Sequence, residues 1–391
     1  MTPELEHGNG SLIADEPIVS GDQDLLDRVE LAEAIADVVL GVRPGTSLTC
    51  AVQGPWGSGK TSVLHLVAAC LRESERPPLV VAFNPWLFSG VDDLLRRFFE
   101  ELTAELRGHD RRKRYKKTRK ALEALADGLE PIDWVPVVGP WSTRLGRAAR
   151  MLLKRRRSDE SLAQQRDATA AILKQQNRQI VLLVDDVDRL EPREIRQVFQ
   201  LVRLIGDLPN MVYVLAFDRV VVEKIIDSGV GVDGHAYLDK IIQVGFDLPN
   251  VSPEHLKEMV TKSIDRVAKD LPAGPFDNHI WTDLLIQGIL PLVRTPRDAV
   301  RLANSLSLTV RHVGEEVSYH EVIALEALRA LRPEVFRILR RGYPWLVSVR
   351  EPMQGQDTER TQVSQMIEKA AGEDRDAVFA ILSIHGRPIG V

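Results

Sequence analysis

Residues 54–61 read Gly54-Pro55-Trp56-Gly57-Ser58-Gly59-Lys60-Thr61 and match the pattern GxxxxGK[ST] at every fixed position. Glycines let the backbone wind so that successive N–H groups point inward at an anion. An apolar run at 47–54 predicts a buried strand before this turn, and residues 61–71 predict a helix after it. The stretch therefore predicts a phosphate-binding loop at a helix N-terminus, where anions are favoured. The alternative is a glycine-rich turn that carries a lysine by chance.

The polar side chains of this loop have expected partners on a bound nucleotide. Lys60 would reach the β- and γ-phosphates, and Thr61 would offer its hydroxyl to Mg²⁺. The residues predicted to bind the nucleotide are Gly54, Pro55, Trp56, Gly57, Ser58, Gly59, Lys60, Thr61 and Ser62.

A second motif follows the apolar run that begins at Ile180 and ends in Asp185 and Asp186. A buried strand would deliver Asp185 to the carboxyl edge of a sheet, where it could hold Mg²⁺. Asp186 would then polarise the attacking water. The alternative is that two carboxylates after a strand form a turn or cap a helix.

A third polar position, Asp218, follows the apolar run 211–217. It is a candidate to contact the γ-phosphate from a neighbouring strand, and an N-cap of the next helix is an equal alternative. The sequence contains no NKxD segment, which favours ATP over GTP, and no LSGGQ-type signature.

Five apolar runs separated by helical patterns predict a parallel sheet with helices on both faces. The expected fold class is α/β, a three-layer αβα sheet of the P-loop NTPase type with a C-terminal helical lid or domain. The expected organisation is a flexible leader at 1–20, a core at 21–250 with an insertion at about 107–178, and a helical region at 251–391.

Composition excludes several classes of protein. The chain has 391 residues, of which 44% are hydrophobic and 27% charged, as in an ordinary globular protein. Two cysteines, Cys50 and Cys70, cannot form a disulfide framework and are expected to be core thiols in a reducing compartment. With no signal peptide or spanning segment visible, we expect a cytoplasmic protein, with peripheral binding at the inner face of the membrane as an alternative.

Charge is concentrated in one segment. Residues 107–157 contain 16 Lys and Arg against five Asp and Glu, chiefly in RRKRYKKTRK at 111–120 and KRRR at 154–157. The apolar stretch WVPVVGPW at 134–141 separates the two clusters. Such clusters attract nucleic acid or anionic lipid, and a solvated basic helical hairpin is the third alternative.

Taken together, these motifs resemble the KAP P-loop NTPases, which are related to the AAA+ and STAND ATPases. The resemblance lies in GPWGSGKTS at 54–62, FNPWLFSG at 83–90, LLVDDVDRLEP at 182–192, VYVLAFDRVVV at 212–222 and YLDKIIQVGFDLP at 237–249. Many members of that family carry transmembrane helices between the two phosphate motifs. In this chain the segment between the two motifs, at about 107–178, is the basic insertion instead.

The resemblance implies a Mg²⁺-dependent ATPase that acts as a conformational switch in a multi-protein system, in signalling or anti-phage defence, and that can form a homo-oligomer. It implies that Arg189 either reaches a neighbouring subunit as an arginine finger or pairs with Asp188. It also implies that Arg297, in TPRDAVRLANSL at 295–306, is a lid arginine on the γ-phosphate or a helix-capping salt bridge. The rival functions are a nucleic-acid-stimulated ATPase and a scaffold that binds ATP without cleaving it.

Three aromatic residues flank the motifs, Trp56, Trp86 and Phe88. They could stack on a nucleotide base. We expect all three to pack in the core instead, since an aromatic residue beside a phosphate loop usually lies under the sheet.

Overall fold

A computed structural model of the protein describes most of the chain in two compact units. The described residues are 16–24, 26–88, 94–108, 115–128, 162–176, 178–230, 233–268, 277–310, 318–346 and 356–383. One unit contains the sheet and comprises residues 17–56 and 60–249, and the other, which includes residues 57–59 and 250–391, is mainly helical.

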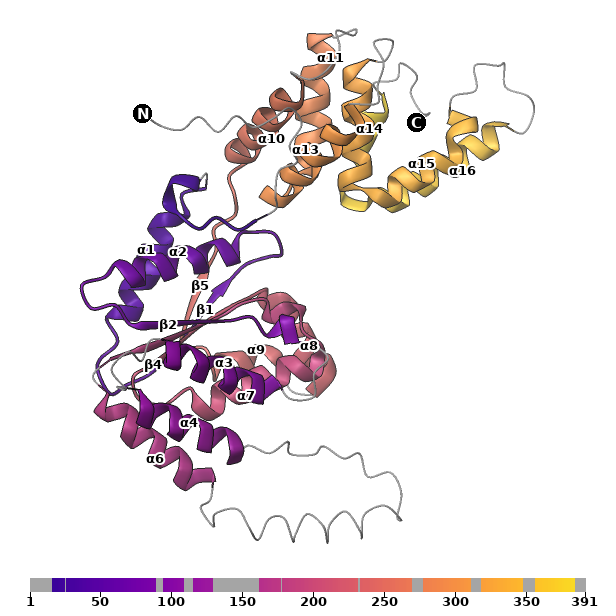
Figure 1. The fold of residues 1–391 in the computed structure, drawn as a ribbon. Coiled ribbons are helices and arrows are strands. Elements are labelled where there is room, and N and C mark those ends of the chain that lie inside the picture. Colours follow the sequence, from indigo (N-terminus) through magenta and orange to yellow (C-terminus); the bar gives the residue numbers. More distant parts are fainter. Residues whose placement is uncertain are drawn as a thin grey trace, which may run out of the picture. The chain divides into compact units, whose positions relative to one another are not determined.

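The first unit is built on a five-stranded parallel sheet (Figure 1). In spatial order its strands are β2 (Leu79–Phe83), β3 (Ile180–Val184), β4 (Met211–Phe217), β1 (Leu48–Gln53) and β5 (Val244–Asp247). Because the strands are parallel, the residues that follow them meet at one carboxyl edge of the sheet.

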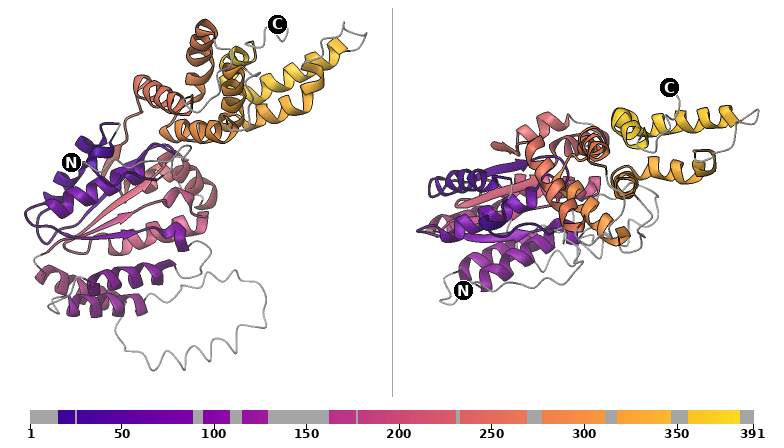
Figure 2. Two further views of the ribbon diagram at one scale, coloured as in Figure 1. Left: turned by 45° about the horizontal axis from the view of Figure 1, so that its top comes forward. Right: turned by 90° about the horizontal axis from the view of Figure 1, so that it is seen from above.

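Helices cover both faces of this sheet (Figure 2). One face packs against α1 (Arg28–Leu40) and α2 (Lys60–Glu73). The other face is covered by α3 (Leu94–Gly108), α7 (Pro192–Ile205), α8 (Arg219–Val230) and α9 (Gly234–Asp239). The helices α4 (Lys116–Gly128) and α6 (Leu162–Gln175) extend the same core, with α4 packed against α3 and α6. Successive residues of a strand point to opposite faces of the sheet, so alternate strand residues are buried in the apolar core on each face. Val181 and Leu183 face the first core, and Leu182 and Val184 face the second. The predicted α/β sheet with helices on both faces is confirmed.

The observed strands follow the predicted apolar runs closely, with one exception. The runs 79–83 and 211–217 form strands over those same residues. The run 241–249 yields a shorter strand, Val244–Asp247, whose residues alternate between exposed and half-buried. This strand lies at the edge of the sheet, so burial there is incomplete and the apolar pattern overstates its length.

The described parts of the basic insertion form helices in the sheet unit. Leu122 and Leu125 on α4 and Leu173 on α6 are buried in the same core as α3 and α7. The Gln176 amide also donates a hydrogen bond of 2.6 Å to the Thr118 hydroxyl. The apolar stretch at 134–141 and the cluster at 154–157 lie outside the described residues.

The second unit consists of helices around their own core. They are α10 (Pro253–Ala268), α11 (Asn278–Asp283), the π-helix η4 (Leu284–Ile289), α12 (Leu290–Leu292), α13 (Pro296–Val310), α14 (Tyr319–Leu331), α15 (Pro333–Leu346), α16 (Gln356–Ala371) and α17 (Arg375–Ser383). Asp374, between α16 and α17, links three connections of this unit, since it accepts hydrogen bonds from Arg294 at 3.0 Å and Arg332 at 2.6 Å. Burial opposes the effect, but these two arginines lower the pKa of the Asp374 carboxyl. Within the described ranges, no helix is long and apolar enough to span a bilayer.

Candidate active site

The loop between β1 and α2 has the backbone that its glycines predict. Gly57 and Gly59 have φ angles of 80° and 94°, in the left-handed region that glycine adopts readily. The Ser58 side chain is buried, and its hydroxyl has no hydrogen-bond partner among the residues that the structure describes. A buried hydroxyl without a partner is costly, so this loop is suited to receive a polar ligand.

Lys60 is the first residue of α2 and is largely buried. Its Nζ donates hydrogen bonds to the carbonyl oxygens of Gly54 at 2.9 Å and Pro55 at 3.3 Å. It also forms an ion pair with Asp188 Oδ2 at 3.3 Å. The ammonium group is thus held inside the loop, next to the amides that would bind a phosphate.

Asp185 and Thr61 lie together, as a shared metal site would require. The register pairs Phe83 with Val184, and the Asp185 amide donates a hydrogen bond of 3.1 Å to the Phe83 carbonyl. The Thr61 side chain is hydrogen-bonded to the Asp185 carboxylate. Burial raises the pKa of Asp185, the hydrogen bond from Thr61 opposes the rise, and the neighbouring charge of Asp186 adds to it. A hydroxyl and a carboxylate are oxygen ligands of the kind that Mg²⁺ prefers, so the two residues fit the predicted metal.

Asp186 is positioned by an unusual backbone conformation and by two side chains. Its φ of 56° lies in the left-handed region, which Asp adopts more readily than most residues. Its Oδ2 accepts a hydrogen bond of 2.9 Å from the Asn84 amide, and its Oδ1 pairs with Arg189 Nε at 2.8 Å. Of the two alternatives for Arg189, the pair with Asp188 is therefore wrong, and the role as an arginine finger stays a prediction. The turn after β3 points Asp188 at Lys60 and leaves Arg189 beside Asp186.

The aromatic residues divide into two groups. Trp56 is 60% exposed and Trp86 is 46% exposed, so the prediction that they pack in the core is wrong. Both follow the ends of strands, where chain segments reach solvent, and Trp86 lies beneath the guanidinium of Arg189 at 5.1 Å. Phe88 does pack against the core, stacked on Phe83 with ring centroids 6.0 Å apart.

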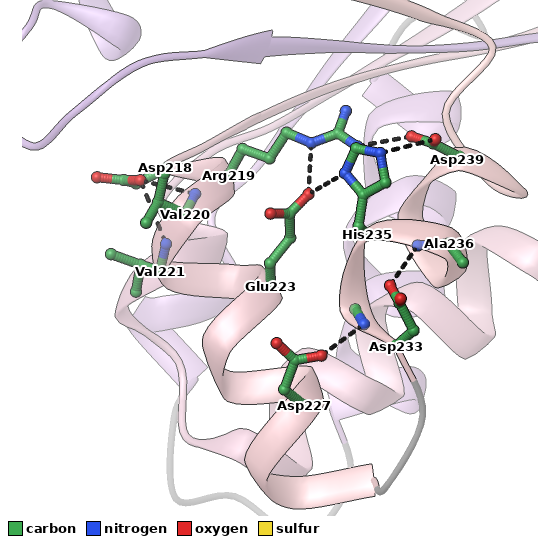
Figure 3. A network of polar contacts seen from close by, with 11 residues as sticks. Asp218, Arg219, Val220, Val221, Glu223, Asp227, Asp233, His235, Ala236 and Asp239 are labelled. Atoms are coloured by element: carbon green, nitrogen blue, oxygen red, sulfur yellow. Dashed lines mark hydrogen bonds and ion pairs between the residues drawn. The ribbon is translucent and has the colours of Figure 1, made fainter.

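Asp218 follows β4 and caps the helix α8 (Figure 3). Its Oδ1 accepts hydrogen bonds from the backbone amides of Val220 at 3.1 Å and Val221 at 3.3 Å. The structure therefore shows the N-cap that was one of the two alternatives for this carboxylate. Its own backbone amide donates a hydrogen bond of 3.0 Å to Asp188 Oδ2.

The neighbouring Arg219 points away from Asp218 toward α9 (Figure 3). It donates hydrogen bonds of 2.7 Å to Glu223 and 2.6 Å to Asp239, and it lies 3.0 Å from His235 Nδ1. The bond from Arg219 lowers the pKa of the exposed Asp239 carboxyl. Arg219, at the N-terminus of α8, thus links α8 to α9 through Asp239.

We expect Asp218→Ala to destabilise the sheet unit by about 1 kcal/mol, because two amides at the start of α8 lose their acceptor. Chemical denaturation measures this change, and Asp218→Asn, which keeps an acceptor oxygen, serves as the control. A variant of unchanged stability that loses ATP turnover would instead indicate that the carboxylate acts on phosphate.

The remaining predicted residues lie in different places. Ser62, on the first turn of α2, accepts a hydrogen bond of 3.3 Å from the Ile18 amide, so the end of the leader runs beside the loop helix. Arg297 lies in the first turn of α13, in the helical unit. That helix end is capped by Thr295 and Asp298, which exchange hydrogen bonds of 3.0 and 3.2 Å. A role for Arg297 at the γ-phosphate stays a prediction.

The sequence analysis did not predict two residues that contact the site at the carboxyl edge of the sheet. Asn84 holds Asp186, and Asp188 holds Lys60. A signal existed for Asn84, because it directly follows β2 and must lie beside the end of β3. The role of Asp188 depends on the turn after Asp186, which the sequence does not predict.

The chain is similar to known proteins. A family model described as the KAP family P-loop domain matches residues 28–313. The phage T7 exclusion protein of Escherichia coli (strain K12) is 26% identical over 330 residues, which are 78% of this chain and 44% of that protein. This chain therefore spans less than half the length of that relative.

Similar solved structures include the Aeropyrum pernix ORC2 protein in ADPNP-ADP complexes, at 12% identity and a TM-score of 0.42, with 91% of this chain and 82% of that chain covered. They also include a Walker-type ATPase of Pyrococcus abyssi, at 14% identity and a TM-score of 0.37, with 95% and 98% covered. The family match is the finding that identifies the chain, because it spans most of its length and both phosphate motifs. The chain belongs to the KAP family of P-loop NTPases.

Proposed function

We propose that the chain binds ATP with Mg²⁺ at the carboxyl edge of its sheet and hydrolyses the bond between the β- and γ-phosphates. The observation that carries this proposal is the convergence of Lys60, Thr61, Asp185 and Asp186 at the carboxyl edge of the sheet, after β1 and β3. The amides of residues 54–61 would cradle the phosphates, and Lys60 would neutralise their charge.

The residues at this edge suffice for attack by water on the γ-phosphate. Thr61 and Asp185 would hold Mg²⁺, which supplies positive charge to the phosphate oxygens. Asp186 would orient the water and accept its proton as the new P–O bond forms and the bond to the β-phosphate oxygen breaks. For Asp186 to do so, its contacts with Asn84 or Arg189 would have to loosen when ATP binds.

We further propose that the cycle between ATP and ADP serves as a conformational switch in a multi-protein system. The name of the E. coli relative points to phage exclusion, and this chain shares 26% identity with it. Expression in a phage-sensitive host tests this proposal through plating efficiency. Protection that is present with the wild type and lost with Lys60→Ala would support it, and equal plaque counts for the two would overturn it.

The basic segment supports a second candidate, an ATPase stimulated by nucleic acid. Residues 107–157 carry 16 Lys and Arg, and Lys116 and Lys117 on α4 are exposed. ATP turnover by the purified protein at low salt, alone and with duplex DNA, RNA or anionic liposomes, separates the partner classes. Stimulation by DNA or RNA that falls steeply with salt favours nucleic acid. Stimulation by liposomes favours a membrane surface, and no stimulation excludes both partners as activators.

A further inference from the structure

The ion pair between Lys60 and Asp188 is a buried contact at the centre of the phosphate site. The two side chains are 8% and 7% exposed, and their charged atoms are 3.3 Å apart. The same ammonium donates hydrogen bonds to the carbonyls of Gly54 and Pro55, so these two oxygens and the Asp188 carboxylate surround it. Asp188 is therefore the anion that neutralises this ammonium in the structure.

Asp188 is fixed at this position by the sheet. It lies in the single turn Val187–Arg189 that follows β3, and Val187 is buried in the core. The same oxygen that faces Lys60 accepts the Asp218 amide at the end of β4 at 3.0 Å. Two adjacent strands thus hold the carboxylate against the loop lysine.

A carboxylate and a phosphate compete for one ammonium group in such a site. The Asp188 carboxylate and a phosphate bound a few ångströms away would repel each other strongly, because water is largely excluded there. If Lys60 turned to the phosphate, Asp188 would remain buried without its counter-charge, which is also unfavourable. Asp186 does not compete for Lys60 in this way, because its charge is neutralised by Arg189.

We propose that Asp188 is an internal competitor for nucleotide phosphate. In the nucleotide-free protein it occupies Lys60, and ATP must displace it to gain the charge of the lysine. Asp188 therefore weakens the affinity of the site for nucleotide. This inference rests on the proposed function, since it requires that ATP binds in the loop.

The test is ATP binding by the full chain in EDTA, at fixed ionic strength, so that metal ligands do not contribute. Asp188→Asn keeps an oxygen that can accept from Lys60 and from the Asp218 amide, but it removes the charge. We expect this variant to bind ATP at least about tenfold more tightly than the wild type. Asp207→Asn is the matched control, because it removes a carboxylate charge of the same unit that pairs with Arg166 on the surface, and we expect its affinity to change by less than about threefold.

An affinity of Asp188→Asn that equals or falls below that of the wild type would overturn the inference and leave the proposed function standing. Tighter binding of the same size in Asp207→Asn would also overturn it, because the effect would then follow from the loss of any negative charge in this unit. If Asp188→Asn does not fold, Asp188→Ser removes the same charge in a smaller side chain. Failure of the wild type itself to bind ATP would overturn both the proposed function and this inference.

Discussion

Lys60→Ala is expected to weaken ATP binding by about 100-fold or more, because the variant loses the charged donor aimed at the phosphates. It should also lower the free energy of unfolding by about 3 kcal/mol, since Asp188 is left buried without its cation. Titration with ATP and chemical denaturation measure the two effects. Lys174→Ala, which removes an exposed lysine of α6 in the same unit, should change neither.

The two effects of this substitution can be separated by a second change. In the double variant Lys60→Ala/Asp188→Asn the unpaired charge is removed, so much of the lost stability should return while ATP binding stays weak. Recovery of binding together with stability would contradict the assigned role of Lys60. It would mean that the single variant fails to bind merely because its fold is damaged.

Asp186→Asn is expected to reduce ATP turnover by about 100-fold or more, with ATP binding nearly retained, because an amide cannot accept a proton from the attacking water. The substitution suits the local structure, since asparagine also adopts the left-handed backbone found at this position, where φ is 56°. Its side-chain oxygen can still accept from Arg189 or Asn84. Steady-state phosphate release measures the loss.

Asp207→Asn offers a control, because Asp207 is a carboxylate in the same unit that pairs with Arg166 on the surface. We expect its turnover to equal that of the wild type. If Asp186→Asn also turns over ATP at the wild-type rate, Asp186 does not activate the water, and the carboxylate that does so must be sought elsewhere at the edge.

The sequence alone predicted the sheet and the loop well, for a physical reason. Strands buried on both faces must be continuously apolar, so runs such as 79–83 and 211–217 are visible without a structure. The phosphate-loop pattern fixes a glycine at position 59, and both Gly59 and the additional Gly57 have positive φ angles that make other residues unfavourable there. Thr61 follows β1 and Asp185 follows β3, so both lie at the carboxyl edge of the parallel sheet, although β4 separates the two strands.

The contacts between charged side chains could not be predicted in the same way. Whether Arg189 pairs with Asp186 or Asp188 depends on one tight turn, in which Asp186 takes a left-handed conformation that no apolar pattern encodes. The exposure of Trp56 and Trp86 was mispredicted because their place at the ends of strands outweighs their hydrophobicity. Such details depend on dihedral angles and on neighbours distant in the chain, which a linear pattern does not contain.

The central claim is that this edge of the sheet cleaves ATP. A single-turnover experiment tests it most directly: excess protein is mixed with ATP labelled in the γ-phosphate, and the release of phosphate is followed with time. We predict release by the wild type in Mg²⁺, none in EDTA, and bound but intact ATP with Asp186→Asn. ATP that binds the wild type in Mg²⁺ and is recovered uncleaved would contradict the claim and favour a nucleotide-gated scaffold.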